Sequence, residues 1–224
     1  MKFISILILY FSITITLQQN EKCYSVKESW HYPSLIPFTG FNSNKELFNW
    51  IKFDRNAASY LFKSDDPKGH LCTTSWNKLY GTSRCNNYLT PHQDSVRFIW
   101  RRSQKCMVFN GDYLVGEISD CNERDLIEIA GYTYDNGDKP FQHQDRLLKI
   151  FNHKVKVEEW YGYRIRINSN NTEYELLDWN SNLIETVIIE QRDCGTTSYS
   201  GSLLGFYFGG QCPAPQTVTA CYKN

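Results

Sequence analysis

A charged segment in the middle of the chain, residues 122–132, carries four ionic side chains and shows the alternation of a β-strand. Side chains an even number of positions apart share one face of an extended strand, so Arg124 and Glu128 fall on the same face. A guanidinium and a carboxylate in that relation can bind a sugar, or they can form a structural ion pair across a sheet. The sequence alone keeps both interpretations open.

A second segment, residues 159–163, carries three aromatic side chains close together: Trp160, Tyr161 and Tyr163. An exposed aromatic ring stacks on the apolar face of a sugar ring, so this cluster is a candidate carbohydrate platform. Aromatic side chains also fill the space between packed sheets, and we expect at least half of these residues to lie in the core.

Several well-known catalytic and metal-binding motifs are absent from the chain. It has no Gly-x-Ser-x-Gly, His-Glu-x-x-His, P-loop or dinucleotide fingerprint, and no Cys-x-x-Cys pair. The acidic stretch from Asp135 to Asp138 offers carboxylates to calcium but lacks a complete calcium loop, which favours a simple turn. No metal and no cofactor are therefore predicted.

The eight cysteines form an even set, which in an exported chain indicates four disulfides. Cys106 and Cys121 flank an Asn110-Gly111 turn between apolar runs, a strong hairpin signal that would bring the two sulfurs together. Proximity along the chain suggests pairing Cys72 with Cys85, and Cys212 with either Cys194 or Cys221. The full set is Cys23, Cys72, Cys85, Cys106, Cys121, Cys194, Cys212 and Cys221.

The first residues are typical of a secretory signal peptide. Lys2 precedes fifteen uncharged, mostly apolar residues, a run shorter than the roughly 20 that a membrane-spanning helix needs. We assign residues 1–19 to this leader, with cleavage between Leu17 and Lys22, and expect no membrane span in the mature chain. We therefore expect a secreted, extracellular protein, in which the sequon at Asn170 is a reasonable glycosylation site.

Composition narrows the class of protein further. The 24 basic and 24 acidic side chains cancel, which argues against a nucleic-acid partner. With 41% hydrophobic and 15% aromatic residues, the chain is too apolar to be disordered. Its length suits one domain over residues 20–224.

The elements that must position these residues are mostly short strands. Apolar runs at 96–100, 126–133 and 146–151, and alternating runs at 154–158 and 164–167, are separated by turn residues. The nearly continuous apolar run at 183–189 suits a strand covered on both faces. A capping box at 43–46, followed by an apolar stripe to residue 53, predicts one helix. The predicted fold is all-β, an antiparallel β-sandwich with a short N-terminal helical elaboration, stabilised by disulfides.

Two patches of sequence resemble a known family. The ending Tyr-x-Gly-Gly-x-x-Pro-Ala-Pro, from Tyr207 to Pro215, looks like the closing strands of some polysaccharide lyases with a concanavalin A-like jelly-roll fold. The charged strand after Arg124 looks loosely like the strand that those enzymes place in their cleft. The eight cysteines are not part of that pattern, and Arg124 is followed by Asp125 rather than by a second basic residue.

The resemblance implies a jelly-roll fold and polysaccharide-related chemistry. For a lyase acting on a uronic-acid polymer, Arg124 would neutralise the sugar carboxylate, and His143 or Tyr132 would remove the adjacent proton. A glycosidase would instead need two carboxylates, of which Glu128 could supply one. Tyr207 joins the three aromatic residues above as a candidate ligand contact.

Three functions follow from these observations. The first is a secreted, disulfide-bonded β-sandwich that binds an extracellular glycan or another extracellular ligand. The second is a polysaccharide-active enzyme, either a lyase or a glycosidase, and the third is a non-catalytic structural or interaction protein. Binding predicts that Trp160, Tyr161 or Tyr163 is exposed, whereas catalysis predicts that Arg124, Glu128 and a base converge.

Overall fold

The structure is a computed structural model of the chain. It describes residues 20–33, 40–62, 69–86, 94–110, 113–135, 147–194, 201–209 and 212–223. The signal peptide predicted over residues 1–19 lies outside these ranges, as does His143.

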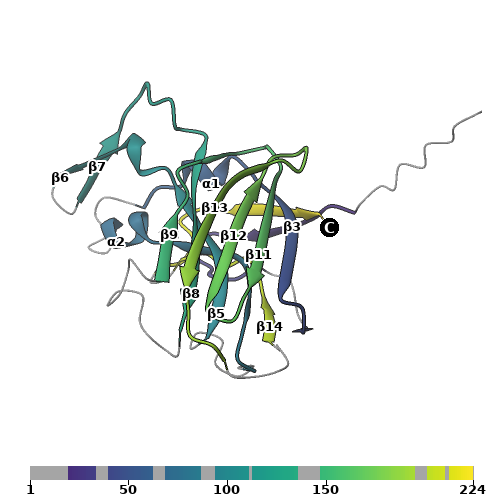
Figure 1. Ribbon diagram of the computed structural model, residues 1–224. Coiled ribbons are helices and arrows are strands. Elements are labelled where there is room, and N and C mark those ends of the chain that lie inside the picture. Colours follow the sequence, from purple (N-terminus) through teal and green to yellow (C-terminus); the bar gives the residue numbers. More distant parts are fainter. Residues whose placement is uncertain are drawn as a thin grey trace, which may run out of the picture.

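Two antiparallel sheets face each other and form the predicted β-sandwich (Figure 1). The six-stranded sheet runs in the order β1 (Lys22–Val26), β15 (Val218–Lys223), β3 (Glu46–Phe53), β11 (Tyr161–Ile167), β12 (Asn171–Leu177) and β13 (Leu183–Glu190). The seven-stranded sheet runs β10 (Val155–Lys156), β8 (Leu126–Tyr134), β5 (Ser95–Arg102), β4 (Asn77–Ser83), β14 (Gly201–Leu204) and β2 (Phe41–Asn42), and β9 (Leu148–Ile150) also pairs with β8. The all-β jelly-roll class expected from the sequence is confirmed.

The core fills the space between the two sheets and is rich in aromatic rings. Phe98 of β5 lies 5.1 Å from Tyr163 of β11 and 5.3 Å from Tyr174 of β12, measured between ring centroids. Both tyrosines are fully buried, and edge-to-face ring packing of this kind stabilises a core beyond simple burial. The period-two alternation of β5, β8 and β11 thus puts one face of each strand on the core.

A small hairpin, β6 (Met107–Asn110) and β7 (Tyr113–Glu117), projects from one end of the sandwich (Figure 1). The Cys106–Cys121 disulfide closes its base, as predicted. Three short helical segments accompany the sheets: α1 (Asn56–Ser59), α2 (Gly69–Thr74) and the 3-10 turn η1 (Gln104–Cys106). Within the described ranges, no helix is both long and apolar enough to cross a membrane.

The other three disulfides join parts of the chain that are far apart in sequence. They link Cys23 to Cys221, Cys72 to Cys212, and Cys85 to Cys194. The pairings based on sequence proximity, Cys72 with Cys85 and Cys212 with Cys194 or Cys221, are therefore wrong. The sheets bring distant segments together, as when β1 pairs with β15 and places Cys23 opposite Cys221.

The helix predicted over residues 43–53 is also wrong, because residues 46–53 form strand β3. Leu47, Ile51 and Phe53 face the core, while Phe48 and Trp50 lie on the other face of the same strand. A stripe of apolar residues on both faces of a strand can imitate helical spacing. Pairing with β11 and β15 on either side supplies the backbone hydrogen bonds of this segment.

Strand β13 differs from its prediction as well. It is the edge strand of the six-stranded sheet, and much of it is exposed, including Leu183 and Ile188. Its continuous apolar run therefore does not reflect cover on both faces.

Candidate functional site

The predicted site residues separate into two groups on opposite sheets. Glu128 and Tyr132 lie on β8, and their side chains share the face that points away from the core. Arg124 precedes β8 in an exposed turn and has no ion-pair partner among the described residues. The predicted pair of Arg124 and Glu128 is therefore not formed. Arg101, directly opposite on β5, takes the place of Arg124, with its Nε 2.8 Å from Glu128 Oε2.

The outer face of the seven-stranded sheet gathers basic and aromatic side chains from neighbouring strands. Strand registers place Lys78 opposite Ile99, and Arg97 opposite Tyr132. We call this face of the sheet the Lys78 face and define it by Lys78, Arg97, Ile99, Arg101, Glu128 and Tyr132. Lys78 and Arg101 are partly exposed, whereas the other four residues are buried.

Lys78 reaches this face because β4 has a register shift between Lys78 and Tyr80. Leu79 and Tyr80 both pack into the core, so the irregularity lets consecutive residues break the usual alternation. The backbone of Lys78 also exchanges two hydrogen bonds with Tyr207, of 2.9 and 3.0 Å. Tyr207, a predicted ligand contact, is thereby fixed beside Lys78.

The Lys78 ammonium lacks a negatively charged partner. Its Nζ lies 5.3 Å from the centroid of the Tyr132 ring, and no described residue offers it a carboxylate or a hydrogen bond. Burial and, to a smaller extent, the positive charge of Arg97 lower the pKa of Lys78 to about 8. The protein thus holds a desolvated cation that nothing in the described structure neutralises.

Further aromatic rings pack against Tyr132 and Tyr207, the two tyrosines beside Lys78. Tyr132 and Tyr134 pack edge to face at 4.8 Å, and Tyr32 packs on Tyr207 at 4.7 Å. Burial raises the pKa of Tyr132, so its phenol is neutral at physiological pH and suits hydrogen bonding better than proton removal. Tyr32 is 58% exposed, which places the solvent-facing end of this surface beside Tyr207.

The other end of the Lys78 face is a closed ionic network. Lys154 Nζ lies 3.1 Å from Glu128 Oε1 and 2.6 Å from Glu123 Oε2. Although burial opposes it, the bonds from Lys154, Ser103 and other donors lower the pKa of Glu123 to about 2. The pKa of Glu128 is also lowered, by Arg101 and Lys154. Both carboxylates are therefore ionised at neutral pH, which suits structural or binding roles rather than that of a protonated general acid.

The predicted aromatic platform lies on the opposite sheet and is only partly available to a ligand. Tyr163 is fully buried between the sheets, so a surface ligand does not reach it, and the expectation that part of the cluster is core holds for this residue. Tyr161 is partly exposed and bonds to Glu159. Trp160 is partly exposed and lies 6.2 Å from Trp179.

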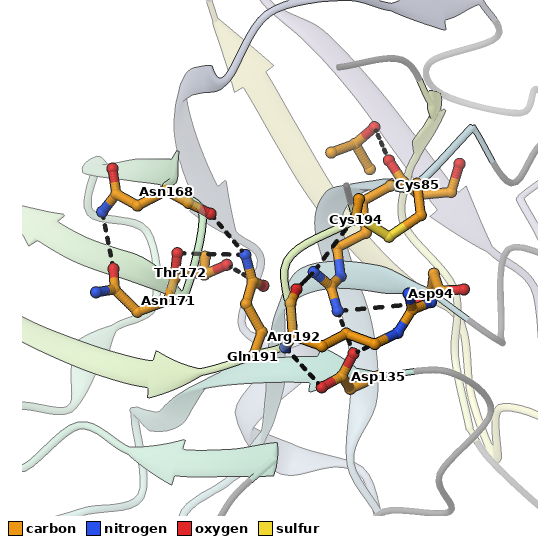
Figure 2. The surroundings of a disulfide bond; sticks show 12 residues. Cys85, Asp94, Asp135, Asn168, Asn171, Thr172, Gln191, Arg192 and Cys194 are labelled. Carbon is orange, nitrogen blue, oxygen red and sulfur yellow. Dashed lines mark hydrogen bonds and ion pairs between the residues drawn. A yellow bond between two sulfur atoms is a disulfide. The ribbon is translucent and has the colours of Figure 1, made fainter. Parts of the chain in front are cut away.

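Asp135 is the described residue of the acidic stretch 135–138, and its carboxylate already has arginine partners. Its carboxylate pairs with Arg84 and Arg192 next to the Cys85–Cys194 disulfide (Figure 2). Residues 136–138 lie outside the described ranges, so the simple turn favoured there stays a prediction. The arginine pairs instead make Asp135 part of the link between this disulfide and the end of β8.

Sequence reasoning missed Lys78, Arg97 and Arg101 on this surface. A signal for the two arginines existed: they alternate with Phe98 and Trp100 in a run predicted to be a strand, which puts them on the face away from the core. Lys78 gave no comparable signal, because the irregularity in β4 and the bridge to Tyr207 arise only in the folded chain.

No protein-family model and no curated protein sequence matches the chain. Solved structures similar to it include an alginate lyase from Klebsiella pneumoniae, with a TM-score of 0.42 and 11% identity over 80% of this chain. They also include a family 16 endo-glucanase from Bacteroides ovatus (TM-score 0.37, 10% identity, 91% of this chain and 79% of that chain) and a kappa-carrageenase from Zobellia galactanivorans (TM-score 0.37, 7% identity, 90% and 76%). The chain spans 57% of the length of the alginate lyase. These enzymes are of the polysaccharide-active kind that the C-terminal ending resembles, and no specific family is identified.

Proposed function

We propose that the protein is exported and binds an acidic glycan on the Lys78 face. The observation that carries this proposal is the Lys78 ammonium, which lies beside Tyr132 and Tyr207 without a carboxylate partner in the described structure. Holding a cation in a desolvated place is costly unless an anion completes it. A sugar carboxylate or sulfate supplies that anion.

The surroundings of Lys78 suit a carbohydrate better than a small inorganic anion. Tyr134 and Tyr207 are partly exposed and offer aromatic surface for the C–H faces of sugar rings, and phenol groups for their hydroxyls. At the far end, Arg101 stacks over the Trp76 ring at 4.3 Å, which extends the same mixture of cation and aromatic ring. The surface therefore offers more than one contact along an extended chain.

Binding is favoured over catalysis by the state of the predicted catalytic groups. Arg124 does not meet Glu128, the Glu128 carboxylate is held by Arg101 and Lys154, and the Tyr132 phenol is neutral. His143, the other candidate base, lies outside the described residues. Incubating the same samples with uronic-acid polymers and recording ultraviolet absorbance tests the lyase alternative, because a lyase forms an unsaturated, absorbing product.

A glycan array of matched pairs tests the proposal. Each acidic oligosaccharide is printed beside its carboxyl-reduced or desulfated counterpart, and the folded protein is applied with its disulfides intact. We expect binding to acidic members and roughly ten- to a hundredfold weaker binding to the neutral ones, the usual contribution of a charge-assisted hydrogen bond. Equal binding to both members of each pair would refute the acidic ligand, and no binding at all would refute the function.

Two variants locate the site. Lys78→Met keeps the aliphatic stem but removes the charge, and we expect it to lose the preference for acidic members. Lys27→Met removes an exposed charge elsewhere and serves as the matched control, with binding unchanged. A Lys78→Met protein that binds as tightly as wild type would place the acidic glycan elsewhere.

Export is supported by the leader-like sequence and by the four disulfides, which persist in oxidising compartments. Asn170 lies in the exposed turn between β11 and β12, and its neighbour Thr172 bonds to Gln191 (Figure 2). Expression in a eukaryotic secretory host tests both points. We expect protein in the medium that shifts on treatment with an N-glycosidase, whereas protein retained in the cytosol would contradict export.

A further inference from the structure

Three tryptophans from separate parts of the chain meet on the outer face of the six-stranded sheet. The ring centroid of Trp179 lies 4.9 Å from that of Trp50, on β3, and 6.2 Å from that of Trp160. Trp179 is 50% exposed, and the other two are partly exposed. We call this surface the tryptophan face.

The tryptophan face is held in place from below. Gly162 of β11 lies under it, where a Cβ atom would come within 3.2 Å of the Trp50 ring and 3.0 Å of the Phe48 ring. The absence of a side chain therefore lets Trp50 and Phe48 lie close against the sheet, where they pack edge to face at 5.3 Å. Rings fixed in this way lose little conformational entropy when a ligand binds.

The turn that carries Trp179 is fixed as well. Asp178 Oδ1 accepts hydrogen bonds from the backbone nitrogens of Asn180 and Asn182, at 2.9 and 2.8 Å, and Asn182 Nδ2 donates to Asp178 Oδ2. An aspartate that bonds its own turn in this way restrains the backbone. The most exposed ring of the tryptophan face is thus presented by an ordered turn.

The charges around the tryptophan face largely cancel. Arg164 and Arg166 both pair with Glu46 and with Glu175, which gives a ladder of two cations and two anions along one side. Lys52 lies over the Trp160 ring at 4.8 Å and also pairs with Glu21. The charged residues beside the tryptophan face therefore offer many hydrogen-bond donors and acceptors with little net charge. The Lys78 face differs, because its lysine has no carboxylate partner among the described residues.

We propose that the tryptophan face is a second carbohydrate site, which binds a neutral sugar chain. A pyranose ring has an apolar C–H face that stacks on an aromatic ring and hydroxyls at its rim that take hydrogen bonds, and the tryptophan face is complementary to both. A protein partner is less well matched, because the core of a protein interface is depleted of charged residues, whereas lysines lie over Trp160 and Trp179 here.

The site rests on different residues from the Lys78 face, since the two surfaces are on opposite sheets of the sandwich. Packed sheets lie about 10 Å apart, so a long glycan on one face does not occupy the other. One molecule would then hold two chains of different chemistry, a neutral one and an acidic one, and act as a bridge between them.

Affinity electrophoresis tests the second site. Native gels are cast with or without a neutral soluble polysaccharide, and xyloglucan, galactomannan and hydroxyethyl cellulose are used in turn. We expect at least one of them to retard the wild-type protein, and Trp179→Ala to abolish most of that retardation. Trp30→Ala removes a tryptophan of similar exposure, 52%, outside this cluster and is the matched control that keeps full retardation.

Three further variants make the outcome decisive. Lys78→Met should be retarded like wild type, so failure of the acidic site and failure of this one are distinguishable. Asp178→Ala, which loosens the turn but keeps all three tryptophans, should bind more weakly, with Asp178→Asn restoring part of the binding. No retardation by any neutral polysaccharide, or full retardation of Trp179→Ala, would overturn the proposal. A concentration-dependent increase in mass that Trp179→Ala removes would also overturn it, in favour of self-association.

Discussion

Lys78, the residue on which the proposed acidic-glycan site depends, carries a cost in stability. The pKa of its ammonium is lowered to about 8 from a usual value near 10.5, chiefly by burial. A lysine whose pKa is lower in the folded than in the unfolded state destabilises the fold while it is protonated, and that penalty disappears as pH rises from about 8 to 10.5. We therefore expect Lys78→Met to fold at least as stably as wild type at pH 7, which fits a residue retained for a ligand.

The lowered pKa of Lys78 also predicts how binding of an acidic glycan depends on pH. The ammonium is the binding form, so binding should be constant below about pH 8 and weaken above it as the amine loses its proton. Calorimetric titrations at pH 6.5 and pH 9.5 measure the effect. Lys78→Arg stays charged over this range and should bind almost equally at both values. A wild-type affinity that is the same at both pH values would contradict a role for the Lys78 charge.

Individual residues of the proposed site were only partly predictable from sequence. Glu128, Tyr132 and Tyr207 were identified as site candidates, and the structure places all three in or beside the Lys78 face. Arg124 was wrongly paired with Glu128, because the strand begins at Leu126 and the preceding residues turn away from it. Strand alternation can be read only as far as the strand extends.

Most strands were predictable as elements, whether their sequences alternate, as in β11, or form apolar runs, as in β5, β8 and β13. The hairpin around Asn110 was identified by its turn chemistry and its flanking cysteines. β3 was mistaken for a helix, since its second face carries Phe48 and Trp50 as part of a surface cluster. That cluster exists because of Trp179, more than a hundred residues away.

Contact between the two sheets at β8 and β12 gives a test of their packing. A Cβ atom on Gly131 would come within 2.6 Å of the Tyr174 ring, which is fully buried and bonded through its hydroxyl to Thr133 and to the backbone of Tyr132. We expect Gly131→Ala to lower the free energy of unfolding by about 1–3 kcal/mol through overpacking. Urea unfolding followed by tryptophan fluorescence measures this.

Gly116→Ala is the matched control for that substitution. Gly116 lies in the β6–β7 hairpin and has no atom within 4 Å of the position of a new Cβ, so the change should be neutral or slightly stabilising. A Gly131→Ala protein as stable as the Gly116→Ala protein would show that the sheets do not pack as closely as described.

At the scale of the whole molecule, a disulfide joins β1 to β15, the first and last strands of the described chain. Cys23–Cys221 joins residues 198 positions apart, whereas Cys106–Cys121 closes a loop of 15. The spacing of cysteines along the chain does not predict Cys23–Cys221, because these two residues meet only when β1 and β15 pair. Chain closure over a longer loop restricts the unfolded state more strongly.

Removing each of these disulfides should therefore have unequal effects. We expect the Cys23→Ala/Cys221→Ala variant to lose about 5 kcal/mol of stability and the Cys106→Ala/Cys121→Ala variant about 3 kcal/mol. Denaturant unfolding compares them, and β1, an edge strand paired with β15, should exchange its amide hydrogens faster in the first variant. A larger loss from the hairpin pair would contradict this order.

Ligand binding at the Lys78 face is tested most directly by chemical-shift mapping of the whole molecule. Isotope-labelled protein with its disulfides intact is titrated with an acidic oligosaccharide selected on the array, and backbone amide shifts are followed by NMR. We expect the largest changes at Lys78, Arg97, Tyr132 and Tyr207, on four segments that only the folded sheet brings together. Changes confined to the tryptophan face, or an absence of changes at these four residues, would contradict the proposed function.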